Sequence, residues 1–294
     1  MAMGMVILAQ SGIGTVGNVS LLCHYICCLL RRHGLRPLEQ IINHLALVNT
    51  LTLLCGGIPP TMAVFGLKYF LNDIGCKLVF YFHRVAWGSS LSTTCLLGGF
   101  QALSINPMNS KWAELKFKSP KYINSPCILS WLFHLLINVM VPMRMIGQKN
   151  SRNISVKLNF GYCSCLFMNT ITESICSVIY SCVDVICLGL KIWASGSIFF
   201  LHRHKQQVQY IHSTRQPPEM SPEARATKSI MILVSTFLIF YSLSSAFEIY
   251  TYLFDNLQLW LVNTNVLLAS CFPTFSPFLL LKSNTHVSSL CFSC

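Results

Sequence analysis

The chain has 294 residues, of which 53% are hydrophobic and only 10% charged, whereas a soluble domain carries about 25% charged residues. Lys and Arg total 21 against 9 acidic residues, a formal net charge of +12. So few charges could not cover a soluble protein of this size, and the basic residues lie in short stretches between apolar runs rather than on an aromatic and basic platform for nucleic acid. The composition therefore favours an integral membrane protein in a lipid bilayer and argues against a nucleic-acid partner.

Seven stretches meet or approach the length of about 20 mainly apolar residues that a membrane-spanning helix needs. In chain order they cover residues 5–30, 38–67, 77–103, 127–145, 175–201, 229–254 and 257–281. The first carries no charged residue and is longer than the apolar core of a signal peptide, so we expect it to be retained as a helix. The pattern predicts an all-α, polytopic bundle of seven helices that forms one domain over residues 1–294.

Basic residues are distributed unevenly between the two sides of this predicted bundle. Thirteen Lys and Arg fall on one side and six on the other. The positive-inside rule makes the side with thirteen cytoplasmic and places the N-terminus outside. Asn153, Ile154 and Ser155 form a glycosylation sequon in a loop that this count places outside, so we predict a glycan on Asn153.

Two cysteines are placed to form a disulfide. Cys76 comes just before the third predicted helix, and Cys163 lies in the following outer loop. Both face the oxidising side, where disulfides persist. The alternative is two free thiols, and we favour the bridge. Most of the other cysteines lie inside apolar runs, where a thiol behaves as a small hydrophobe.

Prolines interrupt two of the predicted spans: Pro59 and Pro60 in the second, Pro273 and Pro277 in the seventh. Each removes a backbone hydrogen bond and favours a kink. We expect neighbouring helices or water to satisfy the carbonyls that are freed. The alternative is that lipid simply tolerates these prolines.

Ionisable side chains inside the bilayer are costly, which makes each one a functional candidate. His83 and Arg84 lie near the outer end of the third helix, Asp184 lies in the fifth and Glu248 in the outer half of the sixth. Arg84 is placed to pair with Glu248 or Asp184, at the depth where a ligand from outside would stop. The alternative is an ion pair that only orients helices. With Trp87, these residues are the predicted ligand contacts.

No catalytic or metal-binding motif is present. The chain has neither G-x-S-x-G nor H-E-x-x-H, and its intramembrane histidines are scattered singly. We therefore expect neither an enzyme nor a metal site, and no cofactor. A small-solute transporter is an alternative because it would also use intramembrane charges and broken helices, but its usual pseudo-symmetric halves and even helix count do not appear.

Several long segments are distinctive beyond their hydropathy. They are residues 44–49 (His-Leu-Ala-Leu-Val-Asn), 65–80 (Phe-Gly-Leu-Lys-Tyr-Phe-Leu-Asn-Asp-Ile-Gly-Cys-Lys-Leu-Val-Phe), 109–116 (Asn-Ser-Lys-Trp-Ala-Glu-Leu-Lys), 201–209 (Leu-His-Arg-His-Lys-Gln-Gln-Val-Gln), 221–228 (Ser-Pro-Glu-Ala-Arg-Ala-Thr-Lys) and 271–278 (Cys-Phe-Pro-Thr-Phe-Ser-Pro-Phe). With shorter matches between them, they cover nearly the whole chain and resemble the vomeronasal type-1 receptors.

The resemblance implies a seven-helix G-protein-coupled receptor in the plasma membrane. Such a receptor detects small pheromone-like or odorant molecules and activates a heterotrimeric G protein, expected here to be of the inhibitory class. The expected G-protein contacts lie at the inner ends of the helices and in the third inner loop: Gln101, Arg203, Lys205 and Lys228.

Some marks of rhodopsin-like receptors are replaced. Residues 100–102 (Phe-Gln-Ala) stand where Asp-Arg-Tyr is usual, Asn49 stands for Asp, and Ser276 stands for the Asn before Pro277. The vomeronasal type-1 receptors, which the chain resembles, also lack these residues. The activation switches of rhodopsin-like receptors therefore cannot be assigned to residues of this chain. Trp87 stands where the family is expected to have a basic residue, and a receptor that no longer signals is a further alternative.

Overall fold

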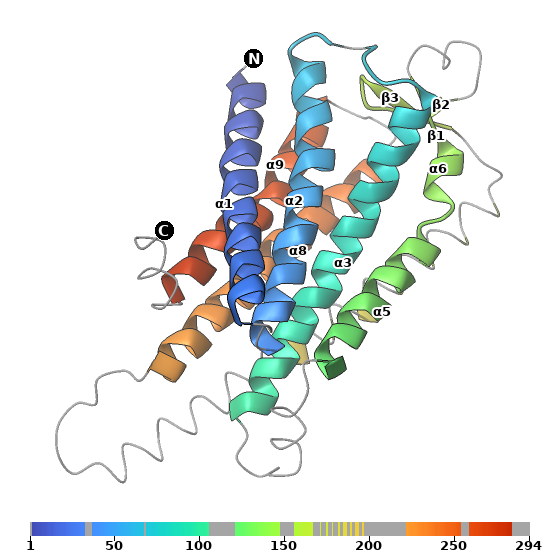
Figure 1. Cartoon of the computed structure of the whole chain (residues 1–294). Helices are drawn as coiled ribbons and strands as arrows, with labels where there is room; N and C mark the ends of the chain where they lie inside the picture. Colours follow the sequence, from blue (N-terminus) through green and yellow to red (C-terminus); the bar gives the residue numbers. More distant parts are fainter. Residues whose placement is uncertain are drawn as a thin grey trace, which may run out of the picture.

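The computed structural model describes residues 2–32, 37–67, 69–105, 121–147, 156–166, 222–253 and 259–283, together with ten helical residues between Ile171 and Gly196. Its elements in chain order are α1 (Ala2–Arg32), α2 (Pro37–Val64), α3 (Asp73–Ile105), α5 (Lys121–Ile137), α6 (Val141–Arg144), β1 (Met145–Gly147), β2 (Val156–Asn159), β3 (Cys163–Leu166), α8 (Pro222–Leu253) and α9 (Leu259–Ser283). The long helices form a bundle, and the small sheet lies at the end that also carries the N-terminus (Figure 1).

By length and composition, five helices in the described part of the chain could cross a membrane: Ala2–Arg31, Leu38–Val64, Ser125–Arg144, Lys228–Phe247 and Trp260–Leu281. α3 is not among these five. It is longer than any of them, at 33 residues, but it carries two basic residues, Lys77 and Arg84. Nine of the ten helical residues described between Ile171 and Gly196 fall in the fifth predicted span, which Ile171 precedes, and their large apolar side chains are exposed, as expected of a face that contacts lipid. The structure confirms the predicted polytopic bundle of α-helices.

The ends of α2 and α3 differ from prediction for local reasons. α2 ends at Val64 rather than at residue 67 because Gly66 adopts a φ of 94°, a left-handed conformation that glycine tolerates. α3 begins at Asp73, four residues before its predicted start. Asn72 caps it, since its Oδ1 accepts a hydrogen bond from the Gly75 N–H at 2.8 Å.

The fourth predicted span, 127–145, whose start was expected to lie a few residues earlier if not at 127, is not one regular helix. α5 begins earlier, at Lys121, and ends at Ile137; a turn then leads to the four-residue α6, and β1 starts at Met145. Pro142 has no N–H to donate to the Asn138 carbonyl, so a regular helix cannot continue there. That carbonyl instead accepts from the Val141 N–H at 2.9 Å.

An antiparallel sheet with the strand order β1-β3-β2 lies against the outer end of α3, and the all-helical prediction did not include it. The predicted disulfide is confirmed: Cys163 on β3 is bonded to Cys76 on α3, with their Cα atoms 5.8 Å apart. The Gly147 N–H of β1 donates to Asp73 Oδ1 at 2.7 Å. Two links, one covalent and one polar, therefore hold the sheet to the first turn of α3.

Both α2 and α9 run on as helices through their prolines, Pro59 and Pro60 in one and Pro273 and Pro277 in the other. Pro277 cannot donate to the carbonyl of Pro273, four residues earlier. The Asn18 side-chain amide of α1 donates to that carbonyl at 2.8 Å. In this case a neighbouring helix does satisfy a freed carbonyl, as predicted.

A buried polar cluster joins four helices around Asn49 of α2. Its amide donates to Ser276 Oγ of α9 at 2.8 Å, and its Oδ1 accepts from Ser90 Oγ of α3 at 3.3 Å. The same amide lies 3.5 Å from Asn18 Oδ1 of α1. Because the Asn49 side chain is fully buried, these bonds replace water, and they fix how α1, α2, α3 and α9 pack.

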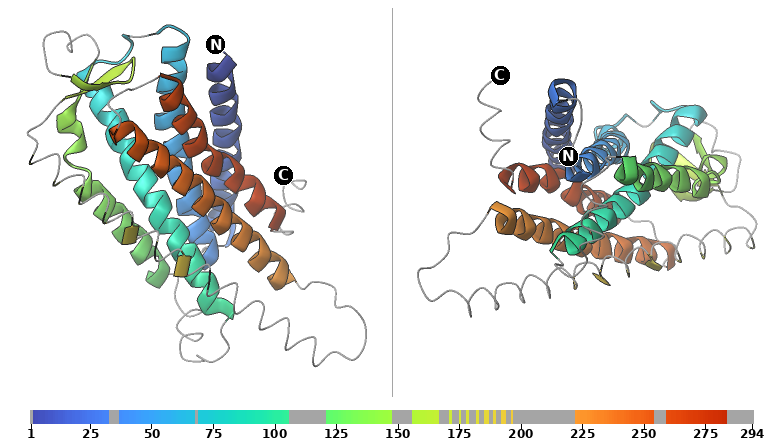
Figure 2. Two further views of the ribbon diagram at one scale, coloured as in Figure 1. Left: turned by 180° about the vertical axis from the view of Figure 1, so that it is seen from behind. Right: turned by 60° about the horizontal axis from the view of Figure 1, so that its bottom comes forward.

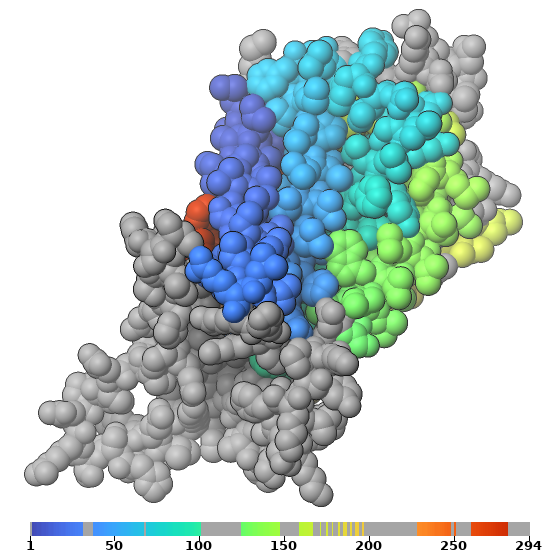
Figure 3. Space-filling model, viewed as in Figure 1, coloured from blue at the N-terminus to red at the C-terminus, as the bar shows by residue number. Residues whose placement is uncertain are grey.

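Apolar packing surrounds this polar cluster. The buried hydrophobic core joins α1, α2, α3, α8 and α9, with Leu21, Leu45, Leu91, Phe237 and Phe272 among its members. Seen from behind, α8 and α9 run side by side across the bundle (Figure 2). On the opposite face, α1, α2, α3 and α5 form a continuous wall (Figure 3).

Candidate ligand-binding site

A cavity of about 380 Å³ lies among α2, α3, α6, α9 and the sheet, in the outer half of the bundle. Small-molecule sites typically measure about 300–1,000 Å³ and combine apolar walls with a few polar groups. Val79, Val141 and Val262 are among the apolar lining residues, and Asn265 and Ser270 of α9 are among the polar ones. Its size and lining suit one small organic molecule.

The sheet forms the outer wall of this cavity. Phe160 and Tyr162, which lie just before β3, face the cavity together with Phe80 of α3. The Phe80 ring lies 5.0 Å from that of Phe160 and 6.0 Å from that of Tyr162. Tyr162 is 6% exposed, and its burial raises the pKa of the phenol above its ordinary value. The disulfide to Cys163 holds this aromatic wall in place.

Two cations line the cavity. Arg84 comes from α3 and Arg144 from the end of α6, and both also interact with other residues of the chain. Among the described lining residues none is acidic. His83 lines the cavity beside Arg84 and packs closely on Gly56 of α2, where a Cβ atom would lie 2.6 Å from His83 Nε2. A side chain at residue 56 would therefore require the His83 ring to move out of its present place.

The predicted acidic partners of Arg84 are not tested by the structure. Asp184 lies outside the described residues, and so does the side chain of Glu248, although its backbone belongs to α8. The pairings of Arg84 with Glu248 or Asp184 therefore stay predictions.

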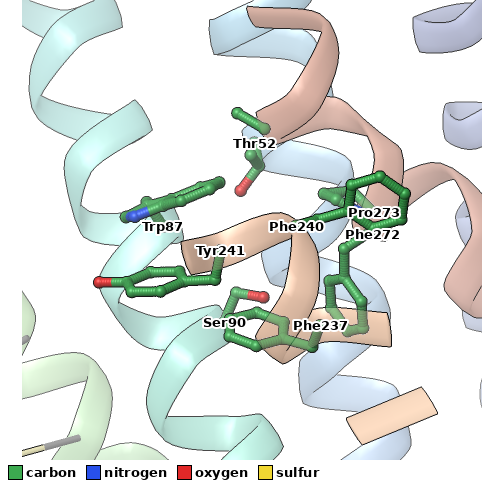
Figure 4. A pocket seen from close by; sticks show the side chains of 9 residues that line it. Thr52, Trp87, Ser90, Phe237, Phe240, Tyr241, Phe272 and Pro273 are labelled. Carbon is green, nitrogen blue, oxygen red and sulfur yellow. The ribbon is translucent and has the colours of Figure 1, made fainter. Parts of the chain in front are cut away.

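A series of aromatic side chains in contact with one another runs from the cavity into the core. The ring of His83 stacks with that of Trp87 at 6.5 Å, and the ring of Trp87 with that of Tyr241 of α8 at 5.3 Å. Tyr241 stacks with Phe237 at 5.4 Å, and Phe237 meets Phe272 of α9 edge-on at 4.5 Å. Figure 4 shows Trp87 above Tyr241, beside a void of only about 10 Å³. Trp87 also lines the large cavity and is the innermost of the α3 residues that do so, so its ring forms part of the cavity's inner floor.

Trp87→Ala is expected to lower ligand potency at least tenfold, about 1.4 kcal/mol or more. The change removes the floor and the stack on Tyr241, so a ligand loses a wall and α3 loses its aromatic contact with α8. The measurement follows from the resemblance to receptors: ligand-stimulated nucleotide exchange by a G protein, normalised to the amount of the chain at the cell surface. The control is Trp87→Phe, which keeps an aromatic ring, so its ligand potency should fall less than about threefold. Equal potency in the alanine variant and the wild type would show that the Trp87 ring does not contact the ligand.

The structure brings three of the five predicted ligand contacts together, since His83, Arg84 and Trp87 all line the cavity. Sequence reasoning missed Arg144 and the aromatic side chains beside the sheet. Arg144 falls at the edge of the predicted fourth span, where a basic residue was counted as a topology signal. The position of Tyr162 next to Cys163 was the available signal, because a disulfide to α3 draws its neighbours to the outer end of that helix.

Two of the four predicted G-protein contacts, Gln101 and Lys228, lie at the other end of the bundle. Gln101 lies near the last turn of α3, with its side chain outside the described residues. Lys228 is exposed near the start of α8. Arg203 and Lys205 lie outside the described part of the chain.

Residues 1–293 match the family model of the vomeronasal organ pheromone receptors. The chain belongs to this family. It is 50% identical to human (Homo sapiens) vomeronasal type-1 receptor 1 over 99% of this chain and 82% of that receptor. It is 45% identical to human vomeronasal type-1 receptor 4 over 99% of this chain and 97% of that receptor. A zebrafish (Danio rerio) protein named olfactory receptor class A-like protein 1 is 30% identical over 97% of this chain and 90% of its own length.

Membership makes the chain a vomeronasal-type chemosensory receptor of the G-protein-coupled class, a multi-pass protein of the plasma membrane. The family is one of receptors and not of enzymes. The described cavity lies at the end of the bundle that carries the N-terminus and the disulfide, which is the outer end by the positive-inside rule.

Proposed function

We propose that this vomeronasal-type receptor binds a small, mainly apolar molecule in the 380 Å³ cavity and activates an inhibitory-class G protein. The observation that carries the proposal is the outer cavity whose floor, Trp87, stacks directly on α8. The cavity's position lets a ligand enter from outside, and the stack gives its occupancy a route into the helix packing.

The walls favour an apolar ligand body with a polar group. Val79, Val141, Val262 and Phe160 supply apolar contact area, while Arg84 supplies a charged hydrogen-bond donor further in along the α3 wall. His83 and, by prediction, Asp184 and Glu248 complete the polar side of the site.

Ligand binding would act by favouring one packing of the helices over another. A ligand that presses on Trp87 changes its stack with Tyr241, and α8 carries that change to its inner end near Lys228. The basic inner loops, with Arg203 and Lys205, would then engage the G protein.

Arg84→Ala is expected to raise the ligand concentration for half-maximal nucleotide exchange at least tenfold, because it removes a charged donor that lines the cavity. Glu248→Ala should have an effect of similar size if the two side chains form the predicted pair, and the double variant should then be no worse than either single one. Leu129→Ala, at an exposed position on α5, is the control. Potency unchanged in both Arg84→Ala and Glu248→Ala would reject this pocket.

We further propose that Asn153 carries an N-linked glycan on the outer side. Asn153→Gln is expected to abolish the shift in electrophoretic mobility that glycosidase treatment causes in the wild type, because the sequon loses its acceptor amide. Asn18 also begins a sequon but is 1% exposed within α1, so Asn18 should not contribute to the shift. A glycosidase shift that persists in Asn153→Gln would place the glycan elsewhere.

A further inference from the structure

One face of α9 lines the cavity with a single amide among apolar side chains. Val262, Val266 and Ala269 lie about one turn apart on this face, and Asn265 lies among them. Asn265 is the only asparagine or glutamine among the described residues that line the cavity. A lone polar group in an apolar wall fixes the orientation of a ligand, because the ligand must bring a complementary group to it.

The Asn265 carboxamide is held in place by α8. Its Oδ1 accepts a hydrogen bond from the Ser244 hydroxyl, with the two oxygens 2.6 Å apart. Ser244 is fully buried, and its hydroxyl donates to no other group in the described part of the chain. If the amide were turned over, this hydroxyl would face an N–H group, and its proton would lose its acceptor. The oxygen of the amide therefore faces α8.

This arrangement leaves the amide nitrogen unused. Nδ2 carries two N–H groups, and neither donates to any residue that the structure describes. The Asn265 side chain is half-buried rather than enclosed, and it lines the cavity. A molecule in the cavity therefore meets a hydrogen-bond donor that has no partner within the described protein.

Ser244 also belongs to the face of α8 that contacts the lining residues of the cavity. It lies three residues after Tyr241, so the two side chains share one face of the helix. Tyr241 stacks on Trp87 of α3 at 5.3 Å, and Ser244 bonds Asn265 of α9. α8 is thus joined to the lining of the cavity at two points, one aromatic and one polar.

We propose that Asn265 determines which ligands this cavity accepts, by donating a hydrogen bond from Nδ2 to a carbonyl oxygen of the ligand. The ligand class is a compact, mainly apolar ketone, aldehyde or ester. Ser244 is a positioning residue, since it fixes the amide and is not itself a lining residue. The inference rests on the proposed binding of a small molecule in this cavity. A ligand without the oxygen leaves the donor unpaired in an apolar wall, which lowers its affinity.

The test compares ligands that differ only in this oxygen. Three matched pairs serve as probes: acetophenone with ethylbenzene, tetralone with tetralin, and methyl naphthyl ketone with ethylnaphthalene. Each is titrated against purified full-length receptor in detergent, and the concentration that gives half of the maximal rise in the thermal unfolding midpoint is measured. Wild type is expected to bind at least one ketone about tenfold more tightly than its hydrocarbon. This readout needs no G protein, so it does not depend on the signalling part of the proposed function.

Variants on α8 and α9 assign the preference to the amide. Asn265→Leu removes the donor and should reduce the preference for the ketone below about threefold. Asn265→Asp keeps the shape but has no N–H group, so it should lose the preference too. Ser244→Ala should lose part of it, whereas Ser244→Thr keeps the hydroxyl and should keep the preference. The matched control is Thr264→Val, because Thr264 precedes Asn265, bonds the Trp260 carbonyl within α9 and is not a lining residue.

The proposal is overturned if wild type binds none of the ketones more tightly than its hydrocarbon, or if Asn265→Leu keeps the wild-type preference. Trp87→Ala separates this failure from a failure of the cavity itself. Probes that lose affinity in Trp87→Ala but keep their preference in Asn265→Leu would reject the role of Asn265 and leave the cavity as the ligand site. Affinities that are unchanged in both variants would reject the cavity as well.

Discussion

Cys76→Ala is expected to leave less than about a tenth of the wild-type receptor at the cell surface and to abolish stimulated nucleotide exchange. The bridge closes a separation of 87 residues, for which the chain-entropy relation gives about 4–5 kcal/mol in a soluble chain. The bilayer already restricts the unfolded chain by holding its helices, so the bridge stabilises this protein by less than that figure. The bridge also anchors the buried outer cluster that contains Met145 and Tyr162, and these residues line the cavity.

The control is Cys182→Ala, which removes an exposed free thiol. Its surface level, measured by biotinylation, should equal that of the wild type. The double variant Cys76→Ala/Cys163→Ala should be no worse than Cys76→Ala, since a single bond is removed in both. Normal surface level and exchange in Cys76→Ala would show that the bridge is dispensable for the site.

Asn49→Leu is expected to lower the thermal unfolding midpoint of detergent-solubilised receptor by at least about 5 °C. Leucine has the same branched outline as asparagine but cannot donate to Ser276 Oγ or accept from Ser90 Oγ. Each buried polar group left without its partner costs about 1–3 kcal/mol, and 1 kcal/mol shifts the midpoint of a domain of about 150–250 residues by about 2–4 °C.

Leu47→Ala is the matched control for this variant, because Leu47 lies two residues away on α2 and is 41% exposed. Its midpoint should change by less than about 2 °C, within the range typical of exposed positions. A thiol-reactive dye that reports unfolding gives both values in one assay. A midpoint for Asn49→Leu as high as that of Leu47→Ala would mean that the polar cluster does not hold the four helices together.

The sequence predicted the helices well because the membrane imposes one strong constraint, that backbone groups be satisfied within a helix. Residue boundaries differed where a single residue decides, as at Asn72, Gly66 and Pro142. The three-stranded sheet was not foreseen, because strands of three or four residues are too short for their alternation to be recognised.

The candidate site was only partly predictable for a different reason. His83, Arg84 and Trp87 lie within five residues on one helix, where intramembrane charge draws attention. Arg144 and Tyr162 reach the same cavity only because a turn and a disulfide redirect the chain after α5. Such long-range placement is not encoded in hydropathy, and the floor contact between Trp87 and Tyr241 depends likewise on how α3 and α8 pack.

The most direct test of this account measures nucleotide exchange on purified inhibitory-class G protein, in membranes that contain the full-length receptor, with and without pooled small volatile molecules and steroids. The account predicts stimulated exchange on that G protein, a loss of at least tenfold in potency in Arg84→Ala and Trp87→Ala, and no stimulation of a stimulatory-class G protein in the same membranes. Surface-expressed wild-type receptor that gives no stimulated exchange with any pool, or the same exchange in both cavity variants, would contradict it.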